Sequence, residues 1–324
     1  MVRTRPSLFV TRRWPEAAEA RLRAACDVTV NASDRPLSRQ EWHDAMLRFD
    51  IICPTVSDQL DEAILMTPGS NVRLIANYGV GYDHIDLDAA QRMGIAVTNT
   101  PGVLTEATAD LALTLILMTS RRAGEGEREL RSGAWTGWRP THLMGQELTG
   151  KRLGLVGFGR IAQATAARAR AFGMTIAYTG RRRADAAIEE RYGAQWFEAL
   201  SDLAAQADIV SLHCPGGEET RHLIDAHILQ LMKPTAILIN TARGSVVDEL
   251  ALANALSERR LWAAGLDVFE AEPQVSEALL KLDNAVLLPH LGSATIEVRN
   301  RMGMCAAANV EAYLAGEELP DRVV

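Results

Sequence analysis

The feature that most limits how this chain can fold is a glycine-rich turn between an apolar run and an alanine-rich segment. The stretch "LGLVGFGRIAQATAARARAFG" carries Gly157, Gly159 and Ala162 in the spacing GxGxxG/A. The pattern alone is common, but here it follows an apolar run at residues 152–157 and opens a helical segment that ends near Gly173. A strand–turn–helix unit of this kind is typical of a parallel sheet that holds a dinucleotide at the N-terminus of the helix.

Each fixed position of this turn has its own physical reason. Gly157 permits the tight turn, Gly159 lets the backbone approach a pyrophosphate, and Ala162 keeps the helix close to the sheet. The helix N-terminus then presents N–H groups and a positive dipole end to the phosphates. An ordinary tight turn without a ligand is the alternative. We expect these residues to contact a cofactor: Gly157, Phe158, Gly159, Arg160 and Ile161.

Apolar runs alternate with amphipathic stretches along the whole chain. The first hundred residues predict strands at 7–10, 28–30, 50–53, 72–76 and 95–98, with amphipathic stretches such as 16–25 and 39–48 between them. An apolar helix is predicted at about 105–119, followed by a polar, glycine-bearing connector or arm. A second series of strands is predicted at 152–157, 175–178, 209–213, 236–240, 263–268 and 285–288. Strands that are buried on both faces have continuous apolar runs, which indicates parallel sheets.

This organisation predicts an α/β fold with a doubly wound parallel sheet in each half of the chain. The 324 residues are enough for two domains. Residues 293–316 are expected to form one helix, which is too short for a domain and is expected to return to the first half. The expected domains are therefore a discontinuous substrate domain, 1–100 plus 293–324, and a dinucleotide-binding domain, 101–292.

Composition excludes several classes of partner. The net charge of −7 argues against nucleic acid and against an acidic membrane surface. The four cysteines are scattered without a CxxC pair, which favours a reducing compartment and no metal site. The apolar run at 8–10 is too short for a signal peptide, and a first strand is favoured over a transit peptide there. We expect a cytoplasmic protein without a membrane span.

The position that selects between the two nicotinamide cofactors lies about 20 residues after the second glycine. There the chain has Thr179 and Gly180, where an acidic residue would accept a hydrogen bond from the ribose 2′-hydroxyl and repel a 2′-phosphate. Arg181 and Arg182 follow and can offer charged, planar donors to a phosphate dianion. A solvated basic turn is the alternative. The sequence predicts that NADP(H) is preferred, with NAD(H) possible.

Three reactive side chains follow three successive predicted strands. Arg243 follows the strand at 236–240, Glu272 follows the next, and His290 follows the last. In open α/β sheets ligands bind beyond the carboxyl ends of the strands, so these side chains can converge. The set suits hydride transfer to a 2-keto acid: Arg243 binds the carboxylate and polarises the carbonyl, and His290 donates a proton. Glu272 fixes the imidazole tautomer and stabilises its charged form.

Longer segments resemble the D-isomer-specific 2-hydroxyacid dehydrogenases over essentially the whole chain. The resemblance rests on "GVGYDHIDL", "NTPGVLTEATAD", "LGLVGFGRIAQ", "LINTARGSVVDE", "GLDVFEAEP" and "LPHLGSAT". Within that family "AYTGRRR" and "GAWTGWRP" are similar to the cofactor turn and interdomain arm of the glyoxylate/hydroxypyruvate reductases. The resemblance implies a Rossmann-type cofactor domain, a flavodoxin-like substrate domain, a cleft between them, and a homodimer that reduces small 2-keto acids to D-2-hydroxy acids.

The resemblance also implies roles for single residues. It gives Arg243, Glu272 and His290 the catalytic roles argued above. Val80 and Gly81 would offer backbone N–H groups to the substrate carboxylate. Trp138 would reach the active site of the neighbouring subunit; the alternative is that Trp135 and Trp138 are structural anchors in the dimer interface. Its remaining cofactor contacts are Thr108, Cys214, Thr241, Ala242, Asp267 and Gly292.

Two alternatives stay open at this point. One is another enzyme of the same family, of the phosphoglycerate, lactate or phosphonate type. The other is a dinucleotide-sensing binding protein, like the corepressors built on this fold, which can keep the catalytic residues. Turnover against a panel of 2-keto acids separates them.

Overall fold

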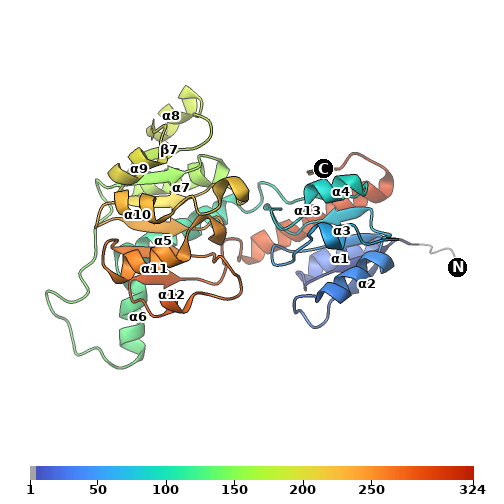
Figure 1. Ribbon diagram of the computed structural model, residues 1–324, viewed down its shortest axis with the longest axis horizontal. Helices are drawn as coiled ribbons and strands as arrows, with labels where there is room; N and C mark the ends of the chain where they lie inside the picture. Colours follow the sequence, from blue (N-terminus) through green and yellow to red (C-terminus); the bar gives the residue numbers. More distant parts are fainter. Residues whose placement is uncertain (1–4) are drawn as a thin grey trace. The chain divides into compact units, whose positions relative to one another are not determined.

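The computed structural model describes residues 5–324, which divide into two compact units (Figure 1). We call the unit formed by the chain up to Leu104 and from Ala294 onward the first lobe, and Thr105–Ser293 the second lobe. Compared with the expected division at residues 100 and 293, residues 101–104 lie in the first lobe and 293 in the second. The reason is that the long helix α5 of the second lobe begins at Thr105.

The first lobe contains a five-stranded sheet in which every neighbouring pair is parallel. Its strand order is β2-β1-β3-β4-β5, which is the flavodoxin-like order. The strands are β1 (Ser7–Val10), β2 (Asp27–Val30), β3 (Ile51–Cys53), β4 (Leu74–Ala76) and β5 (Ala96–Thr98). The predicted doubly wound parallel sheet is therefore confirmed for this half of the chain.

Helices cover both faces of this sheet. Helices α1 (Glu16–Ala25) and α13 (Ile296–Ala315) pack together on one face, so the C-terminal segment returns to this lobe as expected. A Cβ atom at Gly303 would lie 2.4 Å from the Cβ of Ala18, which shows how closely these two helices approach. The other face carries α2 (Arg39–Arg48), α3 (Glu62–Leu65) and α4 (Leu87–Arg92).

The second lobe contains a seven-stranded parallel sheet in the order β12-β11-β10-β9-β6-β7-β8. The chain enters at the centre, adds two strands on one side, then crosses to β9 and adds the rest on the other side. This is the doubly wound order of dinucleotide-binding sheets, extended by one strand, with its switch point between β6 and β9. The strands are β6 (Arg152–Val156), β7 (Thr175–Thr179), β8 (Ala194–Trp196), β9 (Ile209–Leu212), β10 (Ile237–Asn240), β11 (Ala263–Leu266) and β12 (Ala285–Leu287).

Two apolar cores flank the sheet of the second lobe, one under each helical layer. The layer of α5 (Thr105–Ser120), α7 (Arg160–Ala171) and α8 (Ala186–Tyr192) packs on one face. The layer of α9 (Leu200–Gln206), α10 (Ala226–Leu231), α11 (Glu249–Ser257) and α12 (Glu277–Leu280) packs on the other. Helix α6 (Ala123–Arg131) and the loop after it extend away from the sheet, as Figure 1 shows.

Two elements of the second lobe were not predicted. The segment at 121–151 was expected to be a connector or arm, but its first part forms α6, whose residues are all at least partly exposed. Strand β8 was missed because it has three residues at the edge of the sheet, too few to show a period. Within residues 5–324, no helix combines the length and apolarity that crossing a bilayer requires.

Candidate active site

The three strand-end residues lie at one edge of the second sheet. All seven strands run parallel, so their carboxyl ends meet at the same edge. Arg243 follows β10, Glu272 follows β11 and His290 follows β12, and these three strands are neighbours. The three side chains therefore start from the same edge of the sheet.

Glu272 and His290 form a direct pair. Atom Nδ1 of His290 lies 2.8 Å from Oε2 of Glu272, and Oε1 of Glu272 accepts a hydrogen bond of 3.0 Å from the N–H of Phe269. Burial raises the pKa of Glu272, but the hydrogen bond and charge of His290, the Phe269 N–H and the charge of Arg243 together hold that pKa below its usual value. Because an ionised carboxylate only accepts hydrogen bonds, Nδ1 carries the proton and Nε2 is the nitrogen left for proton transfer.

The backbone at His290 is in a conformation that is unusual for a residue with a side chain. Its φ of 54° is left-handed, and its N–H donates to the carbonyl oxygens of Asp267 (2.9 Å) and Leu288 (3.1 Å). Such a conformation costs on the order of 1–3 kcal/mol and persists where surrounding contacts impose it, often at functional sites. The loop after β12 is therefore held in a shape that presents the imidazole.

A buried carboxylate, Asp267, fixes the same loop through hydrogen bonds to its backbone. Asp267 is 1% exposed, and its side chain accepts hydrogen bonds from the N–H groups of Leu291 (2.6 Å) and Gly292 (2.8 Å). The hydroxyl of Thr108 donates to the carbonyl oxygen of Gly292 at 3.0 Å. Burial raises the pKa of Asp267, although the two N–H groups and His290 oppose the shift. Three residues that the resemblance assigned to the cofactor therefore form one network.

The loop that carries Arg243 is anchored by a residue that the sequence analysis did not single out. Asn240 is 1% exposed, its amide nitrogen donates to the carbonyl oxygen of Arg243 (2.8 Å), and its amide oxygen accepts from the N–H of Ala242 (3.0 Å). A Cβ at Gly244 would lie 1.9 Å from the carbonyl carbon of Phe269, so the loops after β10 and β11 are in direct backbone contact. An asparagine that closes an apolar run was the available signal.

The glycine turn has the geometry that a phosphate needs. Gly157 has a φ of 90°, and a Cβ there would lie 2.9 Å from the carbonyl oxygen of His213. Gly159 precedes α7 without a side-chain cap, and apart from its chain neighbours no described residue has an atom within 4 Å of the place its Cβ would occupy. Ala162 is fully buried against the sheet. The open space before uncapped helix N–H groups fits a pyrophosphate.

The other residues of this turn differ in exposure. The ring of Phe158 stacks on Tyr178, with ring centroids 4.2 Å apart. Ile161 is half-buried in the first turn of α7, and Arg160 is exposed.

The turn after β7 offers cations and no carboxylate at the expected position. Thr179 is 5% exposed, and Gly180, Arg181 and Arg182 are exposed. Arg183 is instead held by Glu189 through two hydrogen bonds of 2.9 and 2.8 Å. Arg183 is thus engaged by Glu189, whereas the side chains of Arg181 and Arg182 are exposed.

Residues after β9 and β10 add further candidate contacts. The buried hydroxyl of Thr241 has no hydrogen-bond partner within residues 5–324, which fits a polar ligand at this position. Ala242, the next residue in the chain, is half-buried. Cys214 follows the neighbouring strand β9 and is also half-buried. Burial raises the pKa of the Cys214 thiol to about 11, so the thiol is protonated at neutral pH and is not activated as a nucleophile.

A second histidine near the glycine turn is a competitor for the role of proton donor. Atom Nε2 of His213 lies 2.9 Å from the hydroxyl of Ser211. Burial lowers the pKa of His213 to about 4, so its ring is neutral at physiological pH. The geometry therefore favours His290, which has a carboxylate partner, over His213.

The first lobe holds the predicted carboxylate-binding residues in a fixed loop. The amide nitrogen of Asn77, a fully buried residue, donates to the carbonyl oxygens of Gly79 (3.1 Å) and Gly81 (2.9 Å). His84 contacts the amide oxygen of Asn77 at 3.1 Å, and the amide of Asn99 donates to the carbonyl oxygen of Val80 at 2.8 Å.

With these carbonyl groups engaged, the neighbouring N–H groups are available. No residue in the described part of the chain accepts a hydrogen bond from the N–H of Val80 or Gly81. Consecutive free N–H groups are a typical anion-binding arrangement. Asn77 and His84 are therefore positioning candidates that sequence reasoning missed, although both lie in or beside the quoted "GVGYDHIDL" segment.

Trp138 does not lie among the strand-end residues. It is 81% exposed on the loop after α6, and Trp135 on the same loop is 50% exposed.

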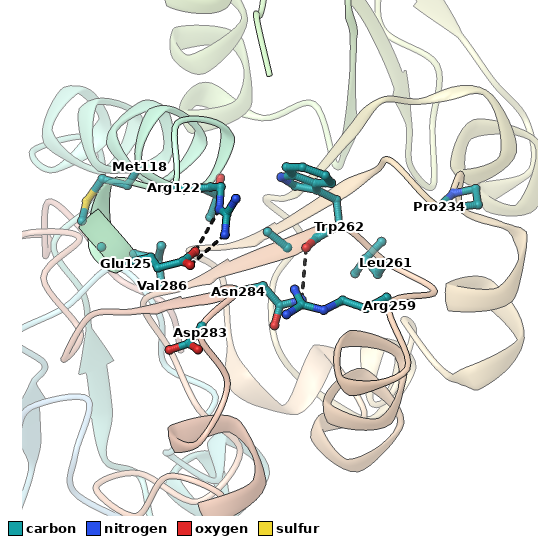
Figure 2. A pocket seen from close by; sticks show the side chains of 13 residues that line it. Met118, Arg122, Glu125, Pro234, Arg259, Leu261, Trp262, Asp283, Asn284 and Val286 are labelled. Carbon is teal, nitrogen blue, oxygen red and sulfur yellow. Dashed lines mark hydrogen bonds and ion pairs between the residues drawn. The ribbon is translucent and has the colours of Figure 1, made fainter. Parts of the chain in front are cut away.

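The second lobe also has a hollow of about 430 Å³ that holds none of the candidate residues (Figure 2). Pro234, Trp262 and Asn284 mark the amino ends of β10, β11 and β12, so the hollow lies at the edge of the sheet opposite His290. Figure 2 shows the ion pair of Arg122 with Glu125 on one side of it and the hydrogen bond between Asn284 and the carbonyl of Trp262 on another.

The comparisons with known proteins agree with this geometry. Residues 113–292 match the family model of the "D-isomer specific 2-hydroxyacid dehydrogenase, NAD binding domain". The glyoxylate reductase of Thermococcus litoralis is 44% identical over 323 residues, covering 98% of this chain and 97% of that protein.

Solved structures give the same result. A putative D-isomer specific 2-hydroxyacid dehydrogenase from Polaromonas sp. superposes with a TM-score of 0.91 at 38% identity, covering 99% of this chain and 100% of that chain. An NADPH-dependent glyoxylate/hydroxypyruvate reductase from Sinorhizobium meliloti, in complex with NADP and malonate, gives 0.88 at 35% identity and covers 99% of this chain and 97% of its own. The glycine turn fits the nicotinamide dinucleotide that these names imply. This chain belongs to the D-isomer specific 2-hydroxyacid dehydrogenases, a family of oxidoreductases.

Proposed function

We propose that this protein reduces small 2-keto acids, glyoxylate and hydroxypyruvate, to the D-2-hydroxy acids with NADPH. The observation that carries the proposal is the 2.8 Å pair of Glu272 and His290 at the strand edge that also holds the glycine turn. The relatives named as glyoxylate reductases and the NADP complex of a glyoxylate/hydroxypyruvate reductase support the choice of substrate and cofactor.

The proposed chemistry assigns each residue one task. When bound, the reduced nicotinamide supplies the hydride that attacks the keto carbon. Arg243 binds the substrate carboxylate and polarises the carbonyl. His290 donates the proton on Nε2 to the carbonyl oxygen and is reprotonated from water afterwards. Glu272 keeps the proton of His290 on Nδ1 and stabilises the imidazolium.

The two lobes take different parts in this proposal. The second lobe binds the cofactor through the glycine turn and through the contacts of Thr108, Cys214, Thr241, Ala242, Asp267 and Gly292. The first lobe contributes the N–H groups of Val80 and Gly81 to the substrate carboxylate, held in place by Asn77.

The preference for NADPH is proposed from the turn after β7. The two exposed arginines, Arg181 and Arg182, bind the 2′-phosphate, and no carboxylate at Thr179 or Gly180 binds the ribose hydroxyl of NADH. The matching family model is described as an NAD binding domain, and the NADP complex of a relative supports the choice of NADPH.

A homodimer is proposed from the exposed apolar side chains of the arm. Leu130 is 63% exposed and Met144 60% exposed, and no residue of α6 is buried. A contact between two copies through the same surface would remove these side chains from water. In such a dimer Trp138, which is 81% exposed, reaches the partner's substrate site and limits the room above the keto acid.

The test is a cofactor-oxidation assay with glyoxylate, hydroxypyruvate, pyruvate and 2-ketoglutarate, each with NADPH and with NADH. We expect turnover with the first two substrates, with NADPH favoured. Equal use of NADH would contradict the cofactor assignment, and a preference for pyruvate or 2-ketoglutarate the substrate assignment. A lack of turnover with any 2-keto acid, in a protein that still binds the dinucleotide, would favour the sensing alternative.

A further inference from the structure

The turn after β7 and the loop after β9 lie on opposite sides of the glycine turn. The sheet order is β9-β6-β7, so the carboxyl end of β6 lies between the ends of its two neighbours. A Cβ at Gly157 would lie 2.9 Å from the carbonyl oxygen of His213, and a Cβ at Gly180 would lie 3.8 Å from the Cα of Gly157. The segments after β7 and β9 therefore border the space that would receive the nucleotide.

One ion pair joins these two borders. Atom Nη1 of Arg181 lies 3.4 Å from Oε2 of Glu219, which belongs to the short helix Glu218–Thr220 in the loop after β9. The two side chains are 82% and 80% exposed. Such an exposed pair contributes little to stability, so a stronger ligand can replace it.

The neighbouring arginine is engaged differently. Arg183 is bound to both carboxylate oxygens of Glu189, and Oε1 of Glu189 also accepts a hydrogen bond of 2.7 Å from the hydroxyl of Tyr178. Glu189 is therefore committed to a three-residue network. Glu219 is the carboxylate that faces the arginine proposed to bind the 2′-phosphate.

We propose that Glu219 is a specificity-determining residue that competes with the 2′-phosphate of the cofactor for Arg181. The proposal rests on the assignment of Arg181 and Arg182 to that phosphate. A bound 2′-phosphate must take the place of the Glu219 carboxylate on the guanidinium, whereas NADH has no such phosphate and leaves the pair intact. Glu219 thus reduces the preference for NADPH that the two arginines create.

The test is the ratio of kcat/KM with NADPH to kcat/KM with NADH, measured at saturating glyoxylate in Glu219→Gln. We expect the ratio to rise about two- to fivefold, through a lower KM for NADPH, because the exposed pair no longer has to be broken. Glu218→Gln is the matched control, because this substitution removes the same charge from the neighbouring position. Glu218 is exposed and has no ion pair in the described residues. An unchanged ratio in Glu219→Gln, or an equal rise in both variants, would overturn the proposal.

A second measurement separates competition for Arg181 from other effects. In the Arg181→Ala background, Glu219→Gln should change the ratio by less than about twofold, since the contested group is gone. A full-sized effect in that background would contradict the inference. If Arg181→Ala with Arg182→Ala leaves the ratio unchanged, the proposed NADPH preference fails. If that double variant lowers the ratio while Glu219→Gln does not raise it, this inference alone fails.

Discussion

Replacing Glu272 by glutamine tests whether the carboxylate is the partner that keeps His290 charged. In the structure its two oxygens accept from two donors, Nδ1 of His290 at 2.8 Å and the N–H of Phe269 at 3.0 Å. A glutamine has one oxygen, so one of the two donors must face its NH₂ group. The variant therefore loses the charge and breaks one of the two hydrogen bonds.

The size of the effect follows from the geometry and the exposure. Two opposite charges about 4 Å apart interact by about 4 kcal/mol at an effective dielectric of 20. The side chains of His290 and Glu272 are 31% and 35% exposed, so solvent screening reduces this to about 1–2 kcal/mol.

The direction of the pH effect depends on which protonation state of His290 is active. Reduction of a keto acid needs a proton on His290, and the ionised carboxylate of Glu272 lies 2.8 Å from Nδ1, where its negative charge stabilises the protonated ring. We expect the alkaline limb of kcat/KM in Glu272→Gln to move to lower pH by about one unit, with kcat at its optimum lowered about tenfold. The assay is the pH dependence of kcat/KM for glyoxylate in both proteins, with Glu270→Gln as a control on the same loop. An alkaline limb that stays in place would refute the pairing as the source of the proton donor's charge.

The remaining predictions concern the proton, the carboxylate site and the arm. His290→Ala should lower kcat by ~10²–10⁴ while the Kd for NADPH, measured by fluorescence titration, stays within about twofold. Asn77→Asp removes two donors to the loop carbonyls and should raise KM for glyoxylate about tenfold, with the Kd for NADPH unchanged; an unchanged KM would separate Asn77 from the substrate. Trp138→Ala should raise kcat/KM for phenylpyruvate relative to glyoxylate while light scattering shows the same oligomeric state; unchanged ratios would make Trp138 an interface anchor only.

The main elements of both lobes could be predicted because their signals are local. The apolar run before Gly157 and the alanine-rich helix after it identify a strand and a helix without any knowledge of distant residues. The same holds for the C-terminal helix α13. One helix is too short to form a domain, so it was expected to pack in the first lobe. Strand β8 was missed since Ala194–Trp196 becomes a strand only by pairing with β7, a contact that its three residues do not encode.

The residues of the candidate site also differ in whether a local sequence signal identifies them. Arg243, Glu272 and His290 could be found because each follows a recognisable strand, and parallel strands place such positions at one edge. Asn240, Asn77 and Glu219 could not be found in this way. Asn240 and Asn77 each make only a few side-chain hydrogen bonds, and Glu219 makes one ion pair. The fold sets the partners in these contacts, and such contacts leave no periodicity in the sequence.

Two of these missed residues have the same physical character. Asn240 and Asn77 are buried amides that fix backbone carbonyl groups and so turn N–H groups or charged side chains outward. A buried amide is costly unless it is fully hydrogen-bonded, so its place in the core implies that the loop it holds must keep one shape. The residues proposed to carry the chemistry are thus readable from sequence. The residues that aim them become visible only when hydrogen bonds between distant segments are known.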